Sequence, residues 1–320
     1  MFVEKRKLGH TGFDVVPLAF GGNVFGWTID EATSFRLLDA FCDAGFNLID
    51  TADSYSRWAP GHEGGESETI IGRWIARRGR HDDVVIATKV GSDMGLGYKC
   101  LRKDYIVQAV EQSLRRLQVD AIDVYQSHWD DDKTPLEESL EAYAGLIKQG
   151  KVKAIGASNI TAERLAQALA VSKQHAYPRY ETLQPLYNLY DRSTFEGPLR
   201  ELCVHKRIGV ITYFSLAAGF LTGKYRSEAD FAKSPRGPGM KKYLNSRGMR
   251  ILAALDSVAL RYDATPAQVA LAWLIARPGV TAAIASATSI AQLDELTAAT
   301  RLALDADAFQ ALDQASAGGE

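Results

Sequence analysis

The sequence predicts an α/β fold, a (β/α)8 TIM barrel preceded by an N-terminal β-hairpin. Two observations favour it: eight short apolar runs recur along the 320 residues, and segments with helical spacing separate them. Repeated strand–helix units build a parallel sheet, and eight of them close naturally into a barrel. The predicted strands are Pro17–Gly21, Asn47–Thr51, Val84–Val90, Ile122–Ser127, Val152–Ser158, Thr182–Pro185, Gly209–Phe214 and Val280–Ala285.

Turn and cap residues predict the elements around these strands. The tetrad Gly9–Gly12 separates Lys5–Leu8 from Asp14–Val16, which indicates a hairpin. Apolar residues recur at helical spacing across Tyr105–Leu117, and Thr134-Pro135 opens another helix. We expect one helix after each of the first seven strands.

An open, doubly wound sheet is the main competing fold. Its dinucleotide-binding form carries G-x-G-x-x-G after the first strand, and the glycines of Gly21–Gly26 do not have that spacing. Barrels commonly use about 250 residues or more as one unit, so residues 1–320 are predicted to form a single domain.

Composition excludes several classes of protein. The formal net charge is −2, which gives no general attraction to nucleic acid or to anionic membranes. The N-terminus is charged where a secretory signal is apolar, and the longest apolar stretch, Val269–Ala276, is too short to cross a bilayer. The odd number of cysteines, three, and their wide separation favour reduced thiols in a cytoplasmic protein. Six scattered histidines lack the spacing of zinc ligands, so no metal is predicted.

One long connection, Gly219–Gly248, is rich in Gly, Pro, Lys and Ser and is predicted to be irregular. Between Lys224 and Arg250 it holds eight basic residues but only two acidic ones, a local excess of +6 in a chain of net −2. A solvated loop is one interpretation of this excess. A clamp for an anionic cofactor is the other.

Reactive side chains follow the predicted strands, at the barrel end where catalytic groups gather. Asp50 and Tyr55 follow the second strand, Lys89 ends the third, and His128 follows the fourth. A lysine that ends a buried apolar strand requires an anionic partner, because an isolated charge is costly to bury. Asp50 on the neighbouring strand is the predicted partner.

Five segments in this order resemble the aldo-keto reductase family, and the resemblance extends from about Leu8 to Leu304. The segments are Gly45–Tyr55 (GFNLIDTADSY), Ile86–Val90 (IATKV), Asp123–Trp129 (DVYQSHW), Gly156–Asn159 (GASN) and Leu216–Tyr225 (LAAGFLTGKY).

The resemblance implies an NADP(H)-dependent reductase of aldehydes or ketones, with a small carbonyl or alcohol as substrate. Asp50, Tyr55, Lys89 and His128 would form its catalytic tetrad, with Tyr55 as general acid and base. Carbonyl reduction needs a proton at oxygen, and Lys89 is expected to lower the pKa of Tyr55, a phenol with an ordinary pKa near 10. His128 is expected to orient the substrate oxygen.

The same resemblance assigns cofactor contacts. Ser158, Asn159 and Gln184 would hold the nicotinamide carboxamide, with Tyr213 stacked on its ring. The backbone of Phe214, Ser215, Leu216 and Ala217 would approach the pyrophosphate, although Phe214-Ser215 stands where relatives have Ser-Pro. Gln292 and Glu295 would contact the adenine.

Cofactor choice depends on the residues near strand eight. Ser286 and Thr288 stand where relatives carry a basic residue, so Lys224 and Arg236 are expected to bind the 2′-phosphate of NADP with help from those hydroxyls. NADP is therefore favoured over NAD.

Four aromatic residues on loops after the first, second and fourth strands are candidates for the substrate pocket: Phe25, Trp27, Trp58 and Trp129. Sugars, aromatic aldehydes and pyridoxal-like compounds fit such a wall. Two other functions remain open: a cofactor-binding regulatory subunit without significant catalysis, and a phosphate-binding barrel enzyme that uses no nicotinamide.

Overall fold

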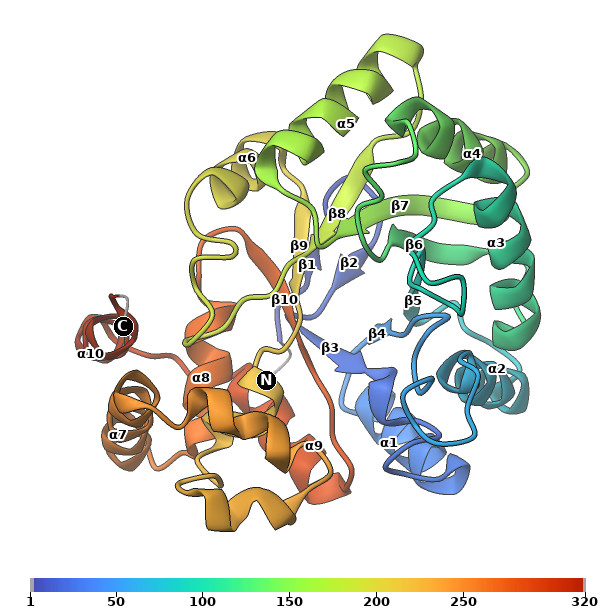
Figure 1. The fold of residues 1–320 in the computed structure, drawn as a ribbon. Helices are drawn as coiled ribbons and strands as arrows, with labels where there is room; N and C mark the ends of the chain where they lie inside the picture. The colour runs from blue at the N-terminus through green and yellow to red at the C-terminus, as the bar shows by residue number, and fades with distance from the viewer. Residues whose placement is uncertain (1–2, 319–320) are drawn as a thin grey trace.

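Eight parallel strands close into a barrel in the computed structural model, which describes residues 3–318. Outer helices surround the barrel, as the predicted fold class requires (Figure 1). All eight predicted strands are present, each within a few residues of its expected bounds. In barrel order they are β3 (Leu18–Gly21), β4 (Leu48–Asp50), β5 (Val85–Val90), β6 (Ile122–Ser127), β7 (Val152–Ser158), β8 (Tyr180–Gln184), β9 (Gly209–Thr212) and β10 (Val280–Ala285).

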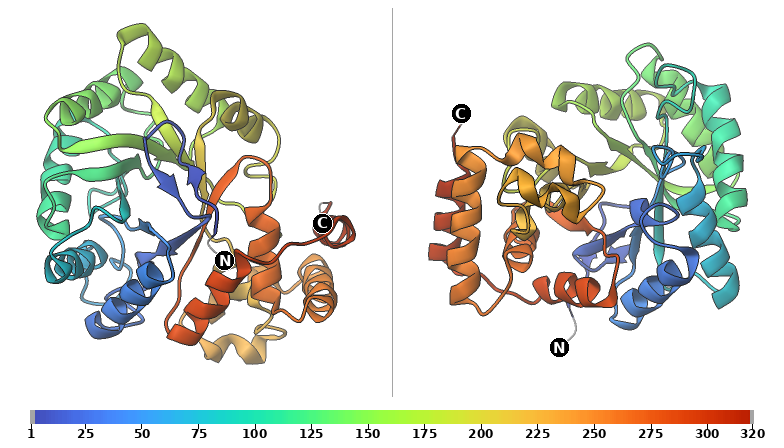
Figure 2. Two further views of the ribbon diagram at one scale, coloured as in Figure 1. Left: turned by 180° about the vertical axis from the view of Figure 1, so that it is seen from behind. Right: turned by 60° about the horizontal axis from the view of Figure 1, so that its bottom comes forward.

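The predicted hairpin is also confirmed. Strands β1 (Arg6–Lys7) and β2 (Asp14–Val15) pair antiparallel. Leu8 and Val15 from this hairpin are fully buried and belong to the same apolar cluster as inward-facing strand residues such as Leu48. The hairpin therefore closes the barrel at the end opposite the candidate site (Figure 2).

Helices follow the strands as the helical spacing predicted. The first six strands are each followed by one α-helix, with the short 3-10 helix η1 (Gly22–Val24) preceding α1. The predicted Tyr105–Leu117 helix is α3. These helices are α1 (Glu31–Asp43), α2 (Glu66–Arg78), α3 (Lys103–Leu117), α4 (Leu136–Lys148), α5 (Ala162–His175) and α6 (Pro198–Lys206).

The chain after β9 differs from the prediction. The connection expected to be irregular contains three 3-10 helices, η2 (Ala217–Thr222), η3 (Glu228–Lys233) and η4 (Gly237–Tyr243). Two α-helices then follow instead of one, α7 (Ser246–Arg261) and α8 (Pro266–Ile275). The three 3-10 helices are too short to show apolar periodicity, so the sequence pattern did not predict these three elements.

Two more helices complete the chain, α9 (Ile290–Ala299) and α10 (Ala306–Ser316). Helix α10 packs against α7 outside the ring, near the C-terminus (Figures 1 and 2). No helix within residues 3–318 combines the length and apolar character that a bilayer crossing requires.

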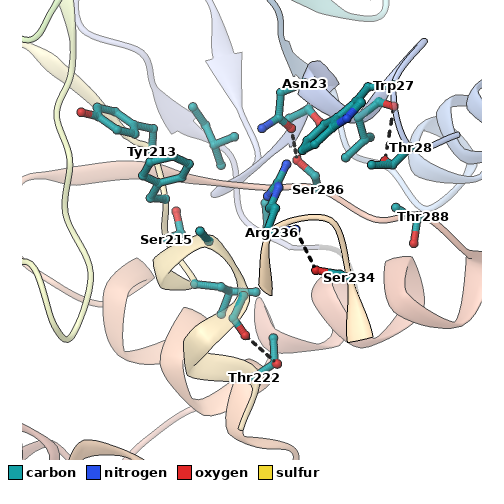
Figure 3. A pocket seen from close by; sticks show the side chains of 18 of the residues that line it. Asn23, Trp27, Thr28, Tyr213, Ser215, Thr222, Ser234, Arg236, Ser286 and Thr288 are labelled. Atoms are coloured by element: carbon teal, nitrogen blue, oxygen red, sulfur yellow. Dashed lines mark hydrogen bonds between the residues drawn. The ribbon is translucent and has the colours of Figure 1, made fainter. Parts of the chain in front are cut away.

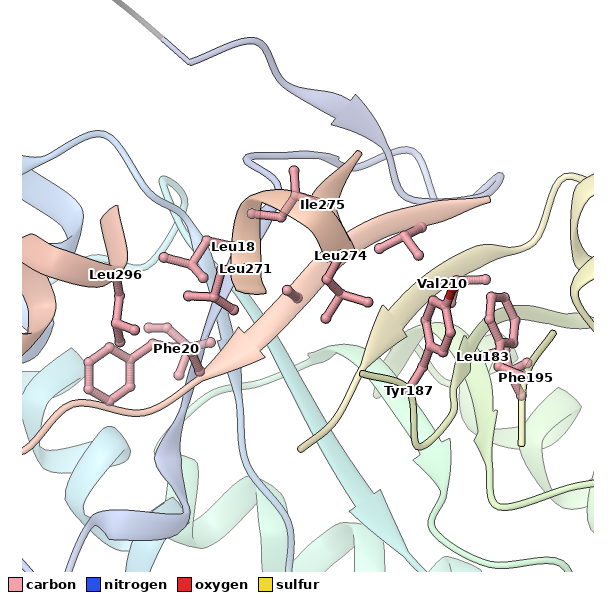
Figure 4. Packing of buried hydrophobic residues seen from close by; sticks show 14 of the residues in the cluster. Leu18, Phe20, Leu183, Tyr187, Phe195, Val210, Leu271, Leu274, Ile275 and Leu296 are labelled. Carbon is pink, nitrogen blue, oxygen red and sulfur yellow. The ribbon is translucent and has the colours of Figure 1, made fainter. Parts of the chain in front are cut away.

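The main hydrophobic core lies between the barrel and its helices. Leu18 and Phe20 of β3 and Val210 of β9 face outward and share this cluster with Leu271 and Leu274 of α8 (Figure 4). The alternate strand residues form a second, smaller cluster inside the barrel, which includes Ala19, Leu48, Val85, Ala87, Val124, Ile211, Ala282 and Ile284. Successive strand residues point to opposite faces, so this second set defines the inward register.

The barrel interior is also tightly packed around Gly156, in the layer of side chains next to this second cluster. Gly156 on β7 pairs with Gln126 and Thr182 on the neighbouring strands. A Cβ atom at position 156 would lie 1.9 Å from Thr182 Oγ1, so only glycine fits there.

Candidate active site

The inward register explains why the candidate residues meet. Asp50 follows inward-facing Leu48 by two residues, and Lys89 follows Ala87 in the same way. His128 continues the series from Val124. Strand alternation therefore aims these side chains into the carboxyl end of the barrel. Ser158, Gln184, Tyr213 and Ser286 occupy the corresponding positions on or just after β7, β8, β9 and β10.

Lys89, Asp50 and Tyr55 form one connected group. The Nζ atom of Lys89 lies 2.8 Å from Asp50 Oδ1, and it donates to Tyr55 Oη at 2.8 Å and to the carbonyl oxygen of Thr51 at 2.7 Å. Tyr55 Oη donates to Asp50 Oδ2 at 2.9 Å, and the amide of Gln184 donates to Asp50 Oδ1 at 2.7 Å. The Lys89 side chain is completely buried, so the predicted Lys89–Asp50 ion pair exists and lies away from water.

Burial and the Asp50 carboxylate hold the pKa of Tyr55 well above its usual value. The sequence-based expectation of a lowered pKa was therefore wrong in sign. The phenol is enclosed and donates its proton to a carboxylate, and both effects oppose ionisation despite the nearby Lys89. At neutral pH the phenol keeps its proton. Burial also lowers the pKa of Lys89, while Asp50 acts in the opposite direction.

His128 forms the next part of the site. Its backbone N–H donates to the carbonyl oxygen of Val90 at 2.8 Å, which holds the residue beside β5. The ring lies edge-on to that of Tyr55, with centroids 6.1 Å apart. Burial, together with the charge of Lys89, places the pKa of His128 well below its usual value, so the ring is neutral at pH 7.

A cavity of about 1010 Å³ opens above this group. Its size is at the upper end of ligand sites, which commonly reach about 1,000 Å³. Most of the predicted site residues line it: Tyr55, His128, Ser158, Asn159, Gln184, Tyr213, Phe214, Ser215, Leu216, Lys224, Arg236, Ser286, Thr288, Gln292, Glu295, Trp27, Trp58 and Trp129.

Four predicted residues do not line the cavity. Asp50 and Lys89 are buried behind Tyr55 and reach the cavity only through that residue, and the other two are Phe25 and Ala217. Phe25 was expected in the substrate pocket, but its side chain is fully buried and stacks on Phe20 with ring centroids 5.3 Å apart. The 3-10 turn η1 directs Phe25 toward the outer core, so that prediction was wrong. Ala217 is also fully buried and faces the core rather than the cavity.

The predicted nicotinamide contacts are held by a hydrogen-bond network. Ser158 Oγ donates to the carbonyl oxygen of Gln184 at 2.7 Å, and Tyr213 Oη donates to Asn159 Oδ1 at 2.7 Å. The Asn159 amide donates to the carbonyl oxygen of His128 at 2.9 Å. Asn159 has a φ of +51°, a left-handed conformation that asparagine adopts more readily than most residues.

The segment after β9 turns sharply below the cavity. Phe214, Ala217, Ala218 and Gly219 all have positive φ angles, and Ser215 Oγ donates to the carbonyl oxygen of Thr212 at 3.1 Å. Phe214, Ser215, Leu216 and Ala218 contribute to the cavity wall. The segment predicted to contact the pyrophosphate therefore lines the same cavity as Tyr55 and His128.

The side of the cavity formed by Lys224 and Arg236 is basic. Arg236 reaches across the mouth and lies over the ring of Trp27, with its guanidinium carbon 5.3 Å from the ring centroid (Figure 3). Within residues 3–318, neither Arg236 nor Lys224 forms an ion pair with a carboxylate. Lys233, by contrast, pairs with Asp230 at 2.7 Å. Arg236 and Lys224 are therefore the cations on this side that remain available to an anion.

The hydroxyls near β10 already have protein partners. Ser286 Oγ lies 2.7 Å from both Gly21 O and Asn23 Oδ1 (Figure 3), and Thr288 Oγ1 donates to Gln292 Oε1 at 3.0 Å. Glu295 accepts a hydrogen bond from Thr265 Oγ1. The two basic side chains are thus the stronger anion ligands of this side.

Sequence reasoning missed several lining residues, among them Asn23, Thr28, Lys233 and Ser234. Asn23 follows β3 directly, so its place after a strand was a usable signal. Lys233 ends η3 and Ser234 follows it, in a segment where no pattern in the sequence indicated that the chain returns to the barrel.

The three tryptophans gather at the end of the cavity near Tyr55 and His128. Trp27 and Trp58 meet edge to face with centroids 5.4 Å apart, and Trp58 also meets the Tyr55 ring at 6.0 Å. Trp129 stacks beside His128 at 6.1 Å. This end is aromatic, and the only acidic residue among the described residues that line the cavity is Glu295, on α9.

The contacts of the cavity fit a dinucleotide. Ser158, Asn159 and Gln184 present polar atoms beside Tyr55, and Lys224 and Arg236, which have no carboxylate partner within residues 3–318, line the same cavity. A ligand that carries both an amide and phosphate groups matches these side chains. Among residues 3–318 no cluster of three or more His, Cys, Asp or Glu side chains could hold a metal ion.

Comparison with known proteins agrees with this geometry. The sequence model described as the Aldo/keto reductase family matches residues 17–317. The chain is 35% identical over 316 residues to "Aldo-keto reductase YhdN" of Bacillus subtilis (strain 168), which covers 95% of this chain and 91% of that protein. It is 30% identical to "Protein tas" of Escherichia coli (strain K12), over 97% of each chain.

A third relative has a different description. The "Probable voltage-gated potassium channel subunit beta" of Arabidopsis thaliana is 31% identical over 301 residues, which cover 92% of this chain and 90% of that protein. The match of the family model across nearly the whole chain and the full-length similarity to these relatives lead to one assignment: this chain belongs to the aldo/keto reductase family of oxidoreductases.

Proposed function

We propose that this protein reduces aldehydes or ketones to alcohols with NADPH, and catalyses the reverse oxidation, with Tyr55 as the proton donor and acceptor. The observation that carries the proposal is the buried contact of Lys89 Nζ with both Asp50 and Tyr55 Oη at the floor of the cavity. A lysine with only a structural role would require a carboxylate partner, but it would not require a contact with a phenol that also lines a ligand cavity.

Each residue has a distinct part in the proposed reduction. NADPH supplies the hydride that adds to the carbonyl carbon. The raised pKa of Tyr55 keeps the phenol protonated, so it can donate a proton to the developing alkoxide. Lys89 stabilises the phenolate that remains, because its cation lies 2.8 Å from the oxygen, and Asp50 holds Lys89 in position. Neutral His128 orients the substrate oxygen.

The cofactor assignment rests on charge. Lys224 and Arg236 have no carboxylate partner among the described residues, and a 2′-phosphate is a dianionic ligand that both can bind. These cations favour NADPH over NADH. Arg236 also stacks on Trp27, so binding of the phosphate would orient a residue that bridges the cavity mouth.

The test is a screen of NADPH oxidation with 4-nitrobenzaldehyde, a sugar aldehyde and pyridoxal, followed at 340 nm. Tyr55→Phe, which keeps the ring and removes the hydroxyl, is the matched control. We expect turnover of at least one aldehyde by the wild-type protein and its loss in the variant.

Two outcomes would replace the proposal. Tight NADPH binding, measured by quenching of tryptophan fluorescence, without turnover of any carbonyl would favour a cofactor-binding regulatory subunit. The Arabidopsis relative is described as a channel subunit. Absence of both binding and turnover would favour a barrel enzyme that uses no nicotinamide.

A further inference from the structure

The ring of His128 has a second contact that the proposed mechanism does not use. Its Nδ1 atom lies 2.8 Å from Ser92 Oγ and 3.4 Å from Ser54 Oγ. Ser92 follows β5 after Gly91, and it is 7% exposed. Ser54 lies in the loop between Asp50 and Tyr55. Two hydroxyls therefore face the same ring nitrogen.

The backbone fixes the position of Ser92. Gly91 has a φ of +101°, and a Cβ atom there would lie 2.6 Å from the Leu101 side chain. Only glycine adopts this conformation without strain, so the chain turns sharply and brings the next residue over the His128 ring. The 2.8 Å contact thus follows from the geometry of the turn after β5.

Proton counting indicates which group donates. Within residues 3–318, His128 Nδ1 is the only hydrogen-bond partner of the Ser92 hydroxyl and of the Ser54 hydroxyl. If Nδ1 carried the proton, the enclosed Ser92 hydroxyl would accept that bond and its own proton would have no acceptor. A buried donor without a partner is unfavourable, because it has lost its hydrogen bond to water. If Nδ1 is the acceptor, its single lone pair takes the proton of the enclosed Ser92 hydroxyl, which lies closer than the half-buried Ser54 hydroxyl.

A neutral imidazole has one N–H and one lone pair, so an acceptor at Nδ1 requires the proton at Nε2. The ring lines the cavity, and Nε2 is the nitrogen without a protein partner among the described residues. We propose that Ser92 is a positioning residue that donates to His128 Nδ1 and thereby keeps the proton on Nε2, where it can bond a substrate oxygen. The benefit to turnover rests on the proposed carbonyl reduction, but the tautomer does not.

The first experiment reads the tautomer directly. Protein labelled with 15N-histidine is compared with its Ser92→Ala variant by NMR at pH 7.5, and the His128 resonances are identified by their loss in His128→Gln. We expect the proton on Nε2 and a lone-pair signal from Nδ1 that moves when the Ser92 hydroxyl is removed. A proton on Nδ1 in the wild-type protein, or an Nδ1 signal unchanged by Ser92→Ala, overturns the proposal.

The second experiment measures the consequence for turnover. Removal of the partner that orients a metal-binding histidine typically lowers activity by about 10–100-fold. By analogy we expect a loss of that order in kcat for Ser92→Ala, with an unchanged dissociation constant for NADPH. Ser92→Thr, which retains the hydroxyl, should restore most of the rate, and Ser54→Ala, which removes the longer contact, should lose less. Equal rates for Ser92→Ala and wild type contradict the role. If the wild-type protein turns over no carbonyl, the proposed function fails while the NMR result still decides the tautomer.

Discussion

Lys89→Met is the substitution whose effect on stability follows most directly from the structure. Methionine preserves the length of the side chain but removes the cation, and Asp50, 1% exposed, keeps only the donors of Tyr55 and Gln184. Breaking a buried ion pair by removal of one partner destabilises proteins by about 3–5 kcal/mol. For chains of roughly this size, about 1 kcal/mol corresponds to about 2 °C in Tm. We therefore expect Tm to fall by about 6–10 °C.

The assay is thermal unfolding followed by circular dichroism, with two matched variants. Lys7→Met removes an ion pair whose lysine is 78% exposed, so it should shift Tm by less than about 2 °C, because exposed pairs contribute about 0–1 kcal/mol. Asp50→Asn/Lys89→Met removes both charges and should recover part of the loss. A change below about 2 °C for Lys89→Met, or a double variant as unstable as the sum of the singles, would refute the buried ion pair.

Three further results follow from the site. Lys89→Met should also lower turnover and shift the pH profile of alcohol oxidation to higher pH, because the phenolate of Tyr55 loses its cation. An unchanged pH profile would contradict the proposal that Lys89 stabilises this phenolate. Lys224→Ala and Arg236→Ala should each weaken NADPH binding about tenfold or more, since a charged contact contributes roughly 1.5–3 kcal/mol. In the same titrations NADH binding should stay nearly unchanged, because NADH has no 2′-phosphate. Equal losses for both cofactors would reject the 2′-phosphate site. Burial, together with the charge of Glu68, raises the pKa of Asp53 to about 8, whereas its value in the unfolded chain is near 4. Between these two pH values the folded state binds one more proton than the unfolded state. The free energy of unfolding should therefore fall by up to about 1.4 kcal/mol per pH unit as pH rises from about 4 to 8. Asp53→Asn should lose this fall and be more stable than wild type at pH 9, whereas Asp43→Asn at an exposed position of α1 should follow the wild-type Tm curve; parallel curves for Asp53→Asn and wild type would contradict the buried acid.

The sequence predicted the barrel because its strands are short apolar runs bounded by turn residues. It also predicted the partnership of Asp50 and Lys89, since alternation along neighbouring parallel strands decides which side chains point inward. These two inferences needed only the local sequence pattern and the principle that an unpaired charge is costly to bury. Most of the other cavity-lining residues were assigned by the resemblance to the aldo-keto reductase family rather than by this reasoning.

The sequence could not predict features that depend on opposing effects on a pKa, or on short turns that have no periodic pattern. Phe25 is two residues from Trp27, yet a single 3-10 turn sends the first into the core and leaves the second in the cavity. The pKa of Tyr55 is raised by burial and by Asp50, and the sequence alone does not reveal the size of either effect. Ser92 belongs to no motif, and its contact with His128 arises from the positive φ of Gly91.

The central claim, that Tyr55 transfers the proton, is tested most directly by the rate of a single turnover. Wild-type protein and Tyr55→Phe, each saturated with NADPH, are mixed with 4-nitrobenzaldehyde or with whichever aldehyde the screen selects, and the decay of cofactor absorbance is followed by stopped flow. General acid catalysis contributes about 10²–10⁴-fold, so the variant should be slower by that factor while its dissociation constant for NADPH stays within about twofold of the wild-type value. A Tyr55→Phe variant that reduces the aldehyde at the wild-type single-turnover rate would contradict the account.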